Sequence, residues 1–407
     1  MSKIVILGWF GDGNFGDEII LECMLADIRR LDPSVSFVVI SDDPADTTRR
    51  HGVRSIGRGG SIQQRLRRLR ELISADLFIL GGGAILSRYS NSDRSVLAWL
   101  VPMHLAHDLG LPTMTCAVGV GDDLSANVVR AMRRVLGETD AICVRDLQSV
   151  ATLRQIGISD KVTLTADPAV LIPTPDSARI GTQASGTRPK VTVFLRHWYV
   201  SEDRVQNEAQ WAEFKTRLAS CLDSLILTRT AQVRFVPMRI KDPIDDDRVV
   251  AREVSSIMTK GSEVTIVDRE LSSSELLRMV AESDLVIGMR LHSLIAAASL
   301  GVPMIAINYH MKVRSFMESI GLGEWITEVG DSDPEWLREA AKAALAGGYP
   351  SAAVQAKVEG LKVLAHLNTE SAIKLVHDSS YQRGAFRRTI RASRILISRS
   401  LGWSNDQ

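Results

Sequence analysis

The segment 288–312 holds the residue types and spacing best suited to chemistry. Arg290, His292 and Ser293 follow a short apolar run, and Lys312 follows the next one. Because the carboxyl ends of parallel strands meet at one edge of a sheet, we expect these side chains to share an edge. Permanent cations beside one imidazole, which titrates near neutral pH, suit an anionic substrate that also receives a proton. The structural alternatives are a packed core histidine at His292 and a surface lysine at Lys312.

Two further arginines end predicted strands. Arg145 follows the apolar run 140–144, and Arg196 ends the run that starts at Lys190. A planar guanidinium binds two oxygens of a carboxylate or phosphate at once, so an arginine at a strand end favours an anionic ligand. An ordinary surface position is the alternative for Arg145.

Glycine-rich turns follow two other predicted strands. The sequence reads G-W-F-G-D-G-N-F-G-D-E at 8–18 and G-G-G at 81–83. Glycine permits tight turns and lets a ligand approach the backbone, and Asp17 is placed to cap a helix whose free amides favour an anion. The spacing is not G-x-G-x-x-G, and no clear acidic ribose partner stands about 20 residues on, so no dinucleotide is expected. The alternatives are a plain strand–helix turn without a ligand for 8–18 and helix–strand packing for 81–83.

Two weaker clusters have the residue types of metal sites. His104, His107 and Asp108 share an ordinary helical segment, and we interpret them as structural. Asp245, Asp246 and Asp247 would suit a metal-dependent glycosyltransferase, but acids at a helix start are stabilised by the helix dipole. We therefore expect no metal site.

Short apolar runs alternate with amphipathic segments along most of the chain. The runs span 3–8, 35–41, 76–81, 113–119, 140–144 and 162–165, then 190–196, 232–237, 263–267, 284–288 and 302–307. Continuous apolar runs of this length are typical of strands buried on both faces of a parallel sheet. With helical patterns between them, they predict an α/β protein with two doubly wound, Rossmann-like domains.

The length and the distribution of polar residues predict how the chain is divided. A chain of 407 residues is expected to form two domains. We predict an N-terminal domain over 1–172, a polar Gly/Pro-rich linker over 173–189 and a C-terminal domain over 190–378. The tail 379–407 is basic: six arginines and no acid lie between 383 and 399. The stretch 383–401 is either an interfacial helix on an anionic membrane or a solvated tail.

Composition excludes several classes of protein. Lys and Arg number 49 against 48 Asp and Glu, and this balance does not fit a nucleic-acid partner. No apolar stretch approaches the roughly 18 residues of a membrane span, and the start does not read as a secretion signal. The four cysteines, Cys23, Cys116, Cys143 and Cys221, form no C-x-x-C pair and are predicted to be buried thiols. These features favour the cytoplasm, with peripheral contact at the inner face of the membrane as an option through the tail.

Taken together, the motifs resemble the polysaccharide pyruvyltransferase family, particularly its bacterial cell-wall-polymer branch. The matching pieces are the two glycine-rich turns, V-R-D-L-Q-S at 144–149, A-D-P-A at 166–169, G-M-R-L-H-S-L-I-A-A-A at 288–298 and G-V-P-M-I-A-I-N-Y-H-M-K-V-R-S-F-M at 301–317. The most specific signal is R-L-H-S, followed twenty residues after its histidine by the lysine of N-Y-x-x-K-V.

This resemblance implies a reaction and a fold. The family transfers pyruvate from phosphoenolpyruvate to two hydroxyls of one sugar, in a surface polysaccharide or its lipid-linked precursor, forming a cyclic ketal and releasing phosphate. It implies a two-domain fold like that of GT-B glycosyltransferases, with the domains facing a cleft, phosphoenolpyruvate on the C-terminal side and the saccharide acceptor on the N-terminal side. No cofactor is implied, since phosphoenolpyruvate is a co-substrate.

The resemblance also implies site residues. His292 is the expected general acid, and Lys312 and Arg145 are expected to bind phosphoenolpyruvate. We assign four further residues to donor binding, namely Arg290, Ser293, Arg196 and Asn308, and five to acceptor binding, namely Gly11, Asn14, Asp17, Gly82 and Gly83. The alternatives are a nucleotide-sugar glycosyltransferase on the same architecture, for which Glu318 and Glu324 are poor ribose partners, and a catalytically silent glycan-binding relative.

Overall fold

The structure is a computed structural model of the chain. It describes residues 2–88, 92–173, 188–198, 207–242, 244–330 and 333–378, together with Arg388 and Arg391. Most of the predicted linker and of the basic tail lies outside these residues. In the part of the chain that is described, no helix has both the length and the apolar character needed to span a bilayer.

The chain divides into two compact units, and neither unit is continuous in sequence. The first comprises Met1–Asp12, Ile20–Pro168 and Val363–Gln407, and the second comprises Gly13–Ile19 and Ala169–Lys362. These units differ from the predicted segments at three places, and the first is that residues 169–172 belong to the second unit. The turn 13–19 joins the second unit, where the Phe15 amide donates to the Met238 carbonyl. The last part of helix α13 (Ser351–His377) joins the first unit because Ala372 and Val376 are buried in that unit's core.

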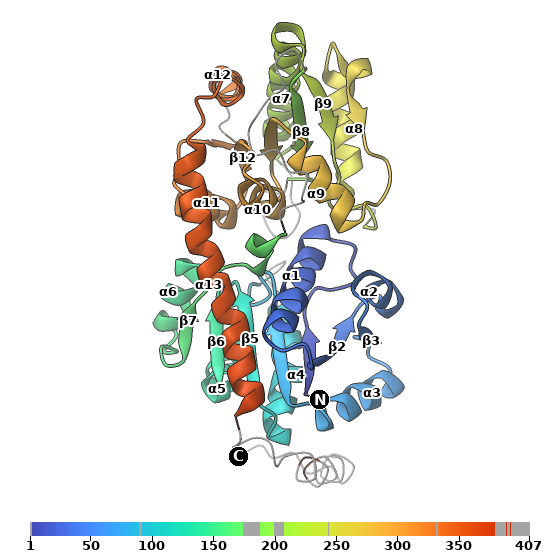
Figure 1. Cartoon of the computed structure of the whole chain (residues 1–407), viewed down its shortest axis with the longest axis vertical. Helices are drawn as coiled ribbons and strands as arrows, with labels where there is room; N and C mark the ends of the chain where they lie inside the picture. Colours follow the sequence, from blue (N-terminus) through green and yellow to red (C-terminus); the bar gives the residue numbers. More distant parts are fainter. Residues whose placement is uncertain are drawn as a thin grey trace. The chain divides into compact units, whose positions relative to one another are not determined.

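The first unit is built on a parallel seven-stranded sheet in the order β3-β2-β1-β4-β5-β6-β7 (Figure 1). Its strands are β1 (Lys3–Leu7), β2 (Ser36–Ser41), β3 (Arg54–Gly57), β4 (Leu77–Gly81), β5 (Thr113–Val118), β6 (Ala141–Val144) and β7 (Val162–Leu164). Alternate strand residues enter two separate cores: Val5 and Leu7 face one, and Ile4 and Ile6 face the other. Both faces of the sheet are therefore covered, as the continuous apolar runs predict.

Helices connect these strands. They are α1 (Phe15–Leu31), α2 (Pro44–His51), α3 (Ile62–Ile73), α4 (Asp93–Leu109), α5 (Ala126–Glu138) and α6 (Leu147–Gln155), and a short 3-10 helix, Pro168–Leu171, follows β7. Side-chain caps fix several starts: Ser125 accepts a hydrogen bond from the Val128 amide at the start of α5, and Asp146 accepts one from the Ser149 amide at the start of α6. All four cysteines are buried and free, which confirms the prediction.

The second unit holds a parallel six-stranded sheet in the order β10-β9-β8-β11-β12-β13. Its strands are β8 (Lys190–Phe194), β9 (Gln232–Phe235), β10 (Thr265–Ile266), β11 (Leu285–Gly288), β12 (Met304–Asn308) and β13 (Ile326–Glu328). The helices are α7 (Glu208–Arg229), α8 (Asp247–Ile257), α9 (Ser273–Ala281), α10 (Leu291–Ser299), α11 (Met311–Ser319), α12 (Pro334–Leu345) and the first part of α13 (Ser351–His377); a 3-10 helix spans Gly261–Glu263. Two doubly wound α/β units confirm the predicted fold class.

In each sheet the strand order reverses beside a central strand, between β1 and β4 and between β8 and β11. Ligands of such sheets bind beyond the carboxyl ends of the strands at this reversal.

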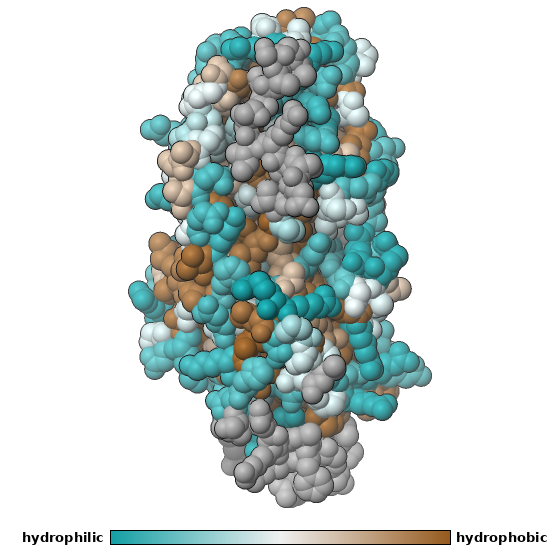
Figure 2. All heavy atoms as spheres, in the orientation of Figure 1, coloured by the Kyte–Doolittle hydropathy of each residue, from teal (hydrophilic) through white to brown (hydrophobic). Residues whose placement is uncertain are grey.

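Away from these strand ends, the distribution of polar and apolar side chains on the surface is ordinary. Figure 2 shows mainly hydrophilic side chains on the visible face, and the most exposed large apolar residues, such as Ile62, Leu147 and Val363, are far apart in sequence.

Candidate active site

The carboxyl ends of three neighbouring strands bring together most of the donor-side residues. Strand β11 pairs with β8 through Gly288 and Phe194, and with β12 through Gly288 and Ala306. The segments that leave these strands carry Arg196 after β8, Arg290 and His292 after β11, and Asn308 and Lys312 at the end of and after β12. All of these residues belong to the second unit.

Arg290 is buried against two aspartates. Its Nε lies 3.2 Å from Oδ2 of Asp247, its Nη2 is 2.5 Å from Oδ1 of the same residue, and Nη2 also reaches Oδ2 of Asp245 at 3.3 Å. Asp247 accepts two further hydrogen bonds, from the backbone amides of Met238 and Arg239. The guanidinium is thus held in a buried ion-pair network between the end of β11 and the start of α8.

The two carboxylates differ in their electrostatics. Burial raises the pKa of Asp247, although the Arg290 guanidinium opposes the shift. Burial would also raise the pKa of Asp245, but Arg290, Arg196 and Arg239 together lower it. Asp246 caps α8 by accepting from the Arg248 amide, which confirms that the acidic run begins a helix. Asp245 and Asp247 act there as counter-ions of buried arginines.

Tyr309 lies between two cations of the same edge. The Arg196 guanidinium donates to the Tyr309 hydroxyl at 3.0 Å, and its central carbon lies 4.7 Å from the ring centroid. The Lys312 Nζ lies 5.5 Å from the same centroid. Burial alone would raise the pKa of the Tyr309 phenol, but Arg196, Lys312 and Arg290 lower it to about 7. The three cations therefore favour the phenolate form of Tyr309.

His292 packs against the glycine-rich turn that begins α1. A Cβ built on Gly16 would lie 2.1 Å from His292 Nδ1, so no side chain fits there unless the imidazole moves. The turn is braced by Asn14, whose Oδ1 accepts from the Gly16 amide at 3.1 Å and whose Nδ2 donates to Asp17 at 2.6 Å. Asn14 and Asp17, both predicted to bind the acceptor, thus hold the backbone that faces the predicted general acid.

Two other predicted donor ligands are engaged with the protein. Ser293 is fully buried, and its hydroxyl donates to the Arg290 carbonyl at 2.6 Å. Asn308 donates from Nδ2 to both carboxylate oxygens of Glu328 at 2.9 Å. Its Oδ1 is buried and has no hydrogen-bond partner among the described residues. Ser293 therefore braces the β11–α10 turn, and Asn308 retains one buried acceptor atom that no described residue uses.

The remaining predicted residues lie in the first unit. Arg145 follows β6, and its side chain, 6% exposed, donates to Asp167 at 3.0 Å. Its Nη2 lies 3.2 Å from where a Cβ on Gly119 would be. Gly119 in turn donates to the Gly83 carbonyl at 2.9 Å, so the glycine turn after β4 and Arg145 occupy one edge of this sheet.

Backbone geometry explains the glycines of the first unit. Gly82 and Gly83 have φ of +77° and +78°, a left-handed conformation that strongly favours glycine. Gly11 has φ of +79°, and a Cβ there would lie 2.2 Å from Ser41 Oγ. Each of these glycines is required by its own turn, whether or not a ligand lies nearby.

Sequence reasoning missed three residues of the second unit's edge. The sequence identifies Asp245 and Asp247 only as a helix start, and it places Tyr309 within N-Y-x-x-K without indicating a role. The signal available for Tyr309 was its place directly after a buried strand and three residues before Lys312. No sequence signal links the aspartates to Arg290, because 43 and 45 residues separate them.

Comparison with known proteins agrees with this architecture. The chain aligns over 89% of its length with UDP-GlcNAc 2-epimerase from Methanocaldococcus jannaschii (all of that chain, TM-score 0.57, 14% identity). It aligns over 93% with a glycosyltransferase from Rickettsia africae (99% of that chain, TM-score 0.60, 12% identity). At such identities the likeness shows the fold alone, and it confirms the GT-B-like prediction.

Sequence comparisons identify the family. The amylovoran biosynthesis protein AmsJ of Erwinia amylovora is 36% identical over 84 residues, which span 21% of this chain and 20% of that protein. The family model described as polysaccharide pyruvyl transferase matches residues 14–311, which include the Gly16 turn, Arg145, Arg290 and His292. The match extends over both units and over most of the chain. The chain therefore belongs to the polysaccharide pyruvyl transferase family.

Proposed function

We propose that this protein transfers the pyruvyl group of phosphoenolpyruvate to two hydroxyls of one sugar, forming a cyclic ketal and releasing phosphate. The acceptor is a surface polysaccharide or its lipid-linked precursor. Family membership supports pyruvyl transfer in polysaccharide biosynthesis. The observation that carries the choice of donor is the group formed by Arg196, Tyr309 and Lys312 at one strand edge.

The charges of this edge suit phosphoenolpyruvate, which carries a phosphate and a carboxylate. Lys312 makes no ion pair with a carboxylate in the described part of the chain. Within the described residues, the ion pairing of Arg196 with carboxylates is limited to a long contact, 3.5 Å, with Asp245. Arg290 is instead neutralised by Asp245 and Asp247. Lys312 and Arg196 are therefore proposed to bind the donor, and Arg290 to position the loop between β11 and α10.

His292 is proposed to start the reaction as general acid. Protonated His292 gives its hydrogen to the methylene carbon of phosphoenolpyruvate, and the electron pair of the double bond forms the new C–H bond. C2 becomes cationic, and one sugar hydroxyl oxygen bonds to it. Proton transfer by a positioned side chain typically contributes about 10²–10⁴-fold to a rate.

The attacking hydroxyl must lose its own proton, and Tyr309 is proposed as the acceptor. Its phenolate oxygen takes that proton as the C2–O bond forms. A second hydroxyl of the same sugar then attacks C2, the bond from C2 to the phosphate oxygen breaks, and phosphate leaves with both electrons of that bond. The proton of the second hydroxyl passes to the imidazole left by the first step, which restores His292, and Tyr309 returns its proton to solvent.

The other assignments stay predictions of the family resemblance. Arg145 is proposed as a further ligand of phosphoenolpyruvate, and Gly11, Asn14, Asp17, Gly82 and Gly83 as acceptor-binding residues. Contact of 383–401 with the membrane, and location at its inner face, concern residues that the structure leaves almost wholly undescribed.

A direct assay tests the proposal. The purified protein is incubated with phosphoenolpyruvate and with glycans or lipid-linked saccharides extracted from host cells. Phosphate release that requires the saccharide, with a mass gain equal to one pyruvyl ketal, is the expected result. Parallel incubations with nucleotide sugars test the glycosyltransferase alternative: release of a nucleoside diphosphate there, with no acceptor-dependent phosphate release from phosphoenolpyruvate, would contradict the proposal.

A further inference from the structure

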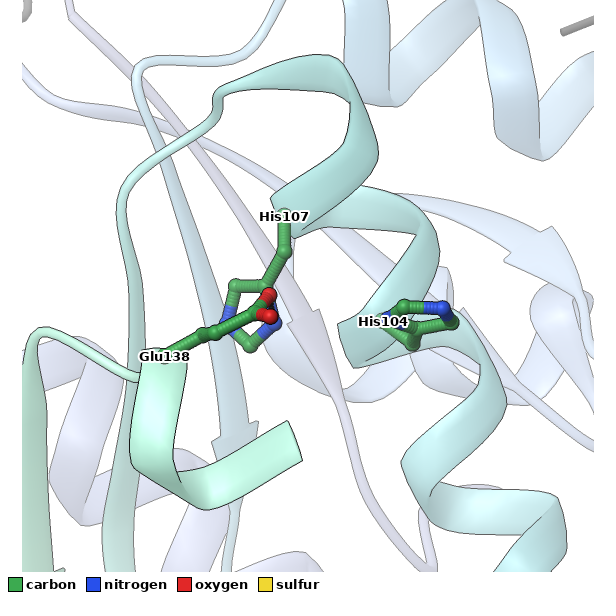
Figure 3. Close-up of side chains that lie close together, drawn as sticks. All are labelled: His104, His107 and Glu138. Carbon is green, nitrogen blue, oxygen red and sulfur yellow. Dashed lines mark ion pairs between the residues drawn. The ribbon is translucent and has the colours of Figure 1, made fainter. Parts of the chain in front are cut away.

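A cluster of metal-ligand residue types lies in the first unit, away from the strand ends described above. His104 and His107 are one turn apart near the end of α4, and Glu138 is the last residue of α5. One ligand atom from each of the three lies within 4.8 Å of the other two. Figure 3 shows the His107 ring beside the Glu138 carboxylate, with His104 projecting from the preceding turn of α4.

His107 has the surroundings of a metal-bound histidine. Its side chain is 7% exposed, and its Nε2 lies 2.7 Å from the Thr113 hydroxyl oxygen. Metal-binding histidines commonly donate their second ring nitrogen to such a partner, which fixes the ring and its tautomer. Either group can donate in this contact, and in the tautomer whose Nε2 hydrogen goes to Thr113 the Nδ1 lone pair is left for a ligand.

The unsatisfied atoms of the cluster point to what is missing. His107 Nδ1 lies 3.5 Å from Glu138 Oε2, yet it is buried and forms no hydrogen bond with any described residue. His104 Nδ1 is also buried, and it too forms no hydrogen bond with any described residue. A buried lone pair that faces a carboxylate oxygen is costly unless a proton or a metal cation lies between them.

We propose that His104, His107 and Glu138 bind one Zn²⁺ ion. Zinc binds imidazole nitrogen and carboxylate oxygen at about 2.0–2.2 Å, so neighbouring ligands of a tetrahedral site lie roughly 3.3–3.5 Å apart. The His107–Glu138 distance already meets this value. Glu138 is 56% exposed and His104 is 30% exposed, so both can rotate to close the remaining gap. Hard cations such as Ca²⁺ and Mg²⁺ prefer all-oxygen ligands and fit less well.

The place of the cluster in the fold assigns the ion a structural role. In a parallel α/β unit the helices end at the amino edge of the sheet, opposite to the edge where ligands bind. His107 accordingly contacts Thr113, the first residue of β5. The ion would link the ends of α4 and α5 and take no part in the proposed transfer. The inference is therefore independent of the proposed function.

The test uses the full-length protein without a histidine tag, freed of metal by a chelator. Competition with a chromophoric zinc chelator is expected to give one Zn²⁺ per chain. Thr113→Val, which keeps all three ligands, should weaken zinc binding about 10- to 100-fold, the usual effect of losing such a supporting partner. His107→Ala and Glu138→Gln should weaken it at least as much. His377→Ala, a histidine on α13 paired with Asp32, is the control and should bind as the wild type does.

Thermal unfolding gives a second readout of zinc binding. Zinc should raise the thermal midpoint of the wild type and not that of Glu138→Gln, because an ion that binds only the folded state stabilises it. Glu138 is largely exposed, so this variant is expected to fold even if His107→Ala does not. Absence of stoichiometric zinc from the wild type, or equal zinc affinity of the wild type and Glu138→Gln, would overturn the inference. Tighter binding of Cu²⁺ than of Zn²⁺ would follow the general order of metal affinities and would be consistent with the proposed site.

Discussion

The Arg196 guanidinium donates a hydrogen bond of 3.0 Å to the Tyr309 hydroxyl and also lies over the ring of the same residue. This pairing joins the segment after β8 to the segment after β12. With Lys312 on the same ring, it stabilises negative charge on the phenol oxygen. A tyrosine in this state can take a proton from an alcohol, a task for which no residue was assigned from the sequence.

Tyr309→Phe should remove that proton acceptor while it keeps the ring. The pKa of about 7 means that the phenolate is present above neutral pH and is lost as the pH falls below 7. The wild-type kcat/KM should therefore fall on the acid side of pH 7, and Tyr309→Phe should lose activity by about 10²–10⁴-fold at pH 8. Measurement of kcat/KM from about pH 5.5 to about pH 9 checks this. If kcat/KM of Tyr309→Phe falls below pH 7 as that of the wild type does, then another group causes this fall.

His292→Ala and Lys312→Ala should separate chemistry from donor binding. Loss of the general acid should lower kcat by about 10²–10⁴-fold with little change in the KM for phosphoenolpyruvate. Loss of the Lys312 charge should raise that KM roughly 10- to 100-fold, the scale of a hydrogen bond to a charged group. Met311→Ala, an exposed neighbour on α11, is the control. Full activity of either variant would remove that residue from the mechanism.

The sequence was sufficient for the elements with a strong apolar pattern and insufficient for those without one. Strands such as β1 and β4 are continuous apolar runs and were found. The strands β3 and β13 were missed because Arg-Ser-Ile-Gly and Ile-Thr-Glu are short and carry polar residues. The end of α13 was assigned to the second domain, since no local pattern shows that Ala372 and Val376 pack into the first unit's core.

The candidate site was predictable to the same extent. The strand-end positions of Arg196, His292 and Lys312 followed from the order of the elements. The order of the elements does not show whether a guanidinium is available to a ligand. That availability depends on counter-ions that are distant in sequence. Arg290 and Arg145 both follow strands, and both are ion-paired to buried aspartates, Arg290 to Asp247 and Arg145 to Asp167.

Arg290→Ala should destabilise the protein, because it leaves Asp247 and Asp245 buried without their main counter-ion. Removing one partner of a buried ion pair typically costs about 3–5 kcal/mol in the free energy of unfolding. Burial already raises the pKa of Asp247, and loss of Arg290 should raise it further. The folded variant then holds a proton more tightly than the unfolded chain does, so its stability falls as the pH rises.

Denaturant unfolding of Arg290→Ala at an acidic and at an alkaline pH checks this sign. The stability difference from the wild type should be larger at the higher pH. Arg290→Met combined with Asp247→Leu and Asp245→Asn should recover much of the loss, because no uncompensated charge remains. If the stability difference between Arg290→Ala and the wild type is the same at both pH values, then Asp245 and Asp247 do not cause it.

Gly16→Ala should impair the reaction more than it impairs folding. The new Cβ would lie 2.1 Å from His292 Nδ1, so the imidazole must leave its position against the α1 turn. Gly137→Ala, on α5 with no atom within 4 Å of the new Cβ, is the matched control and should be neutral or slightly stabilising. Thermal unfolding and kcat are measured for both variants. If Gly16→Ala loses stability but retains the wild-type kcat, then the contact between His292 and the glycine turn serves packing, and the position of the imidazole is not set by this turn.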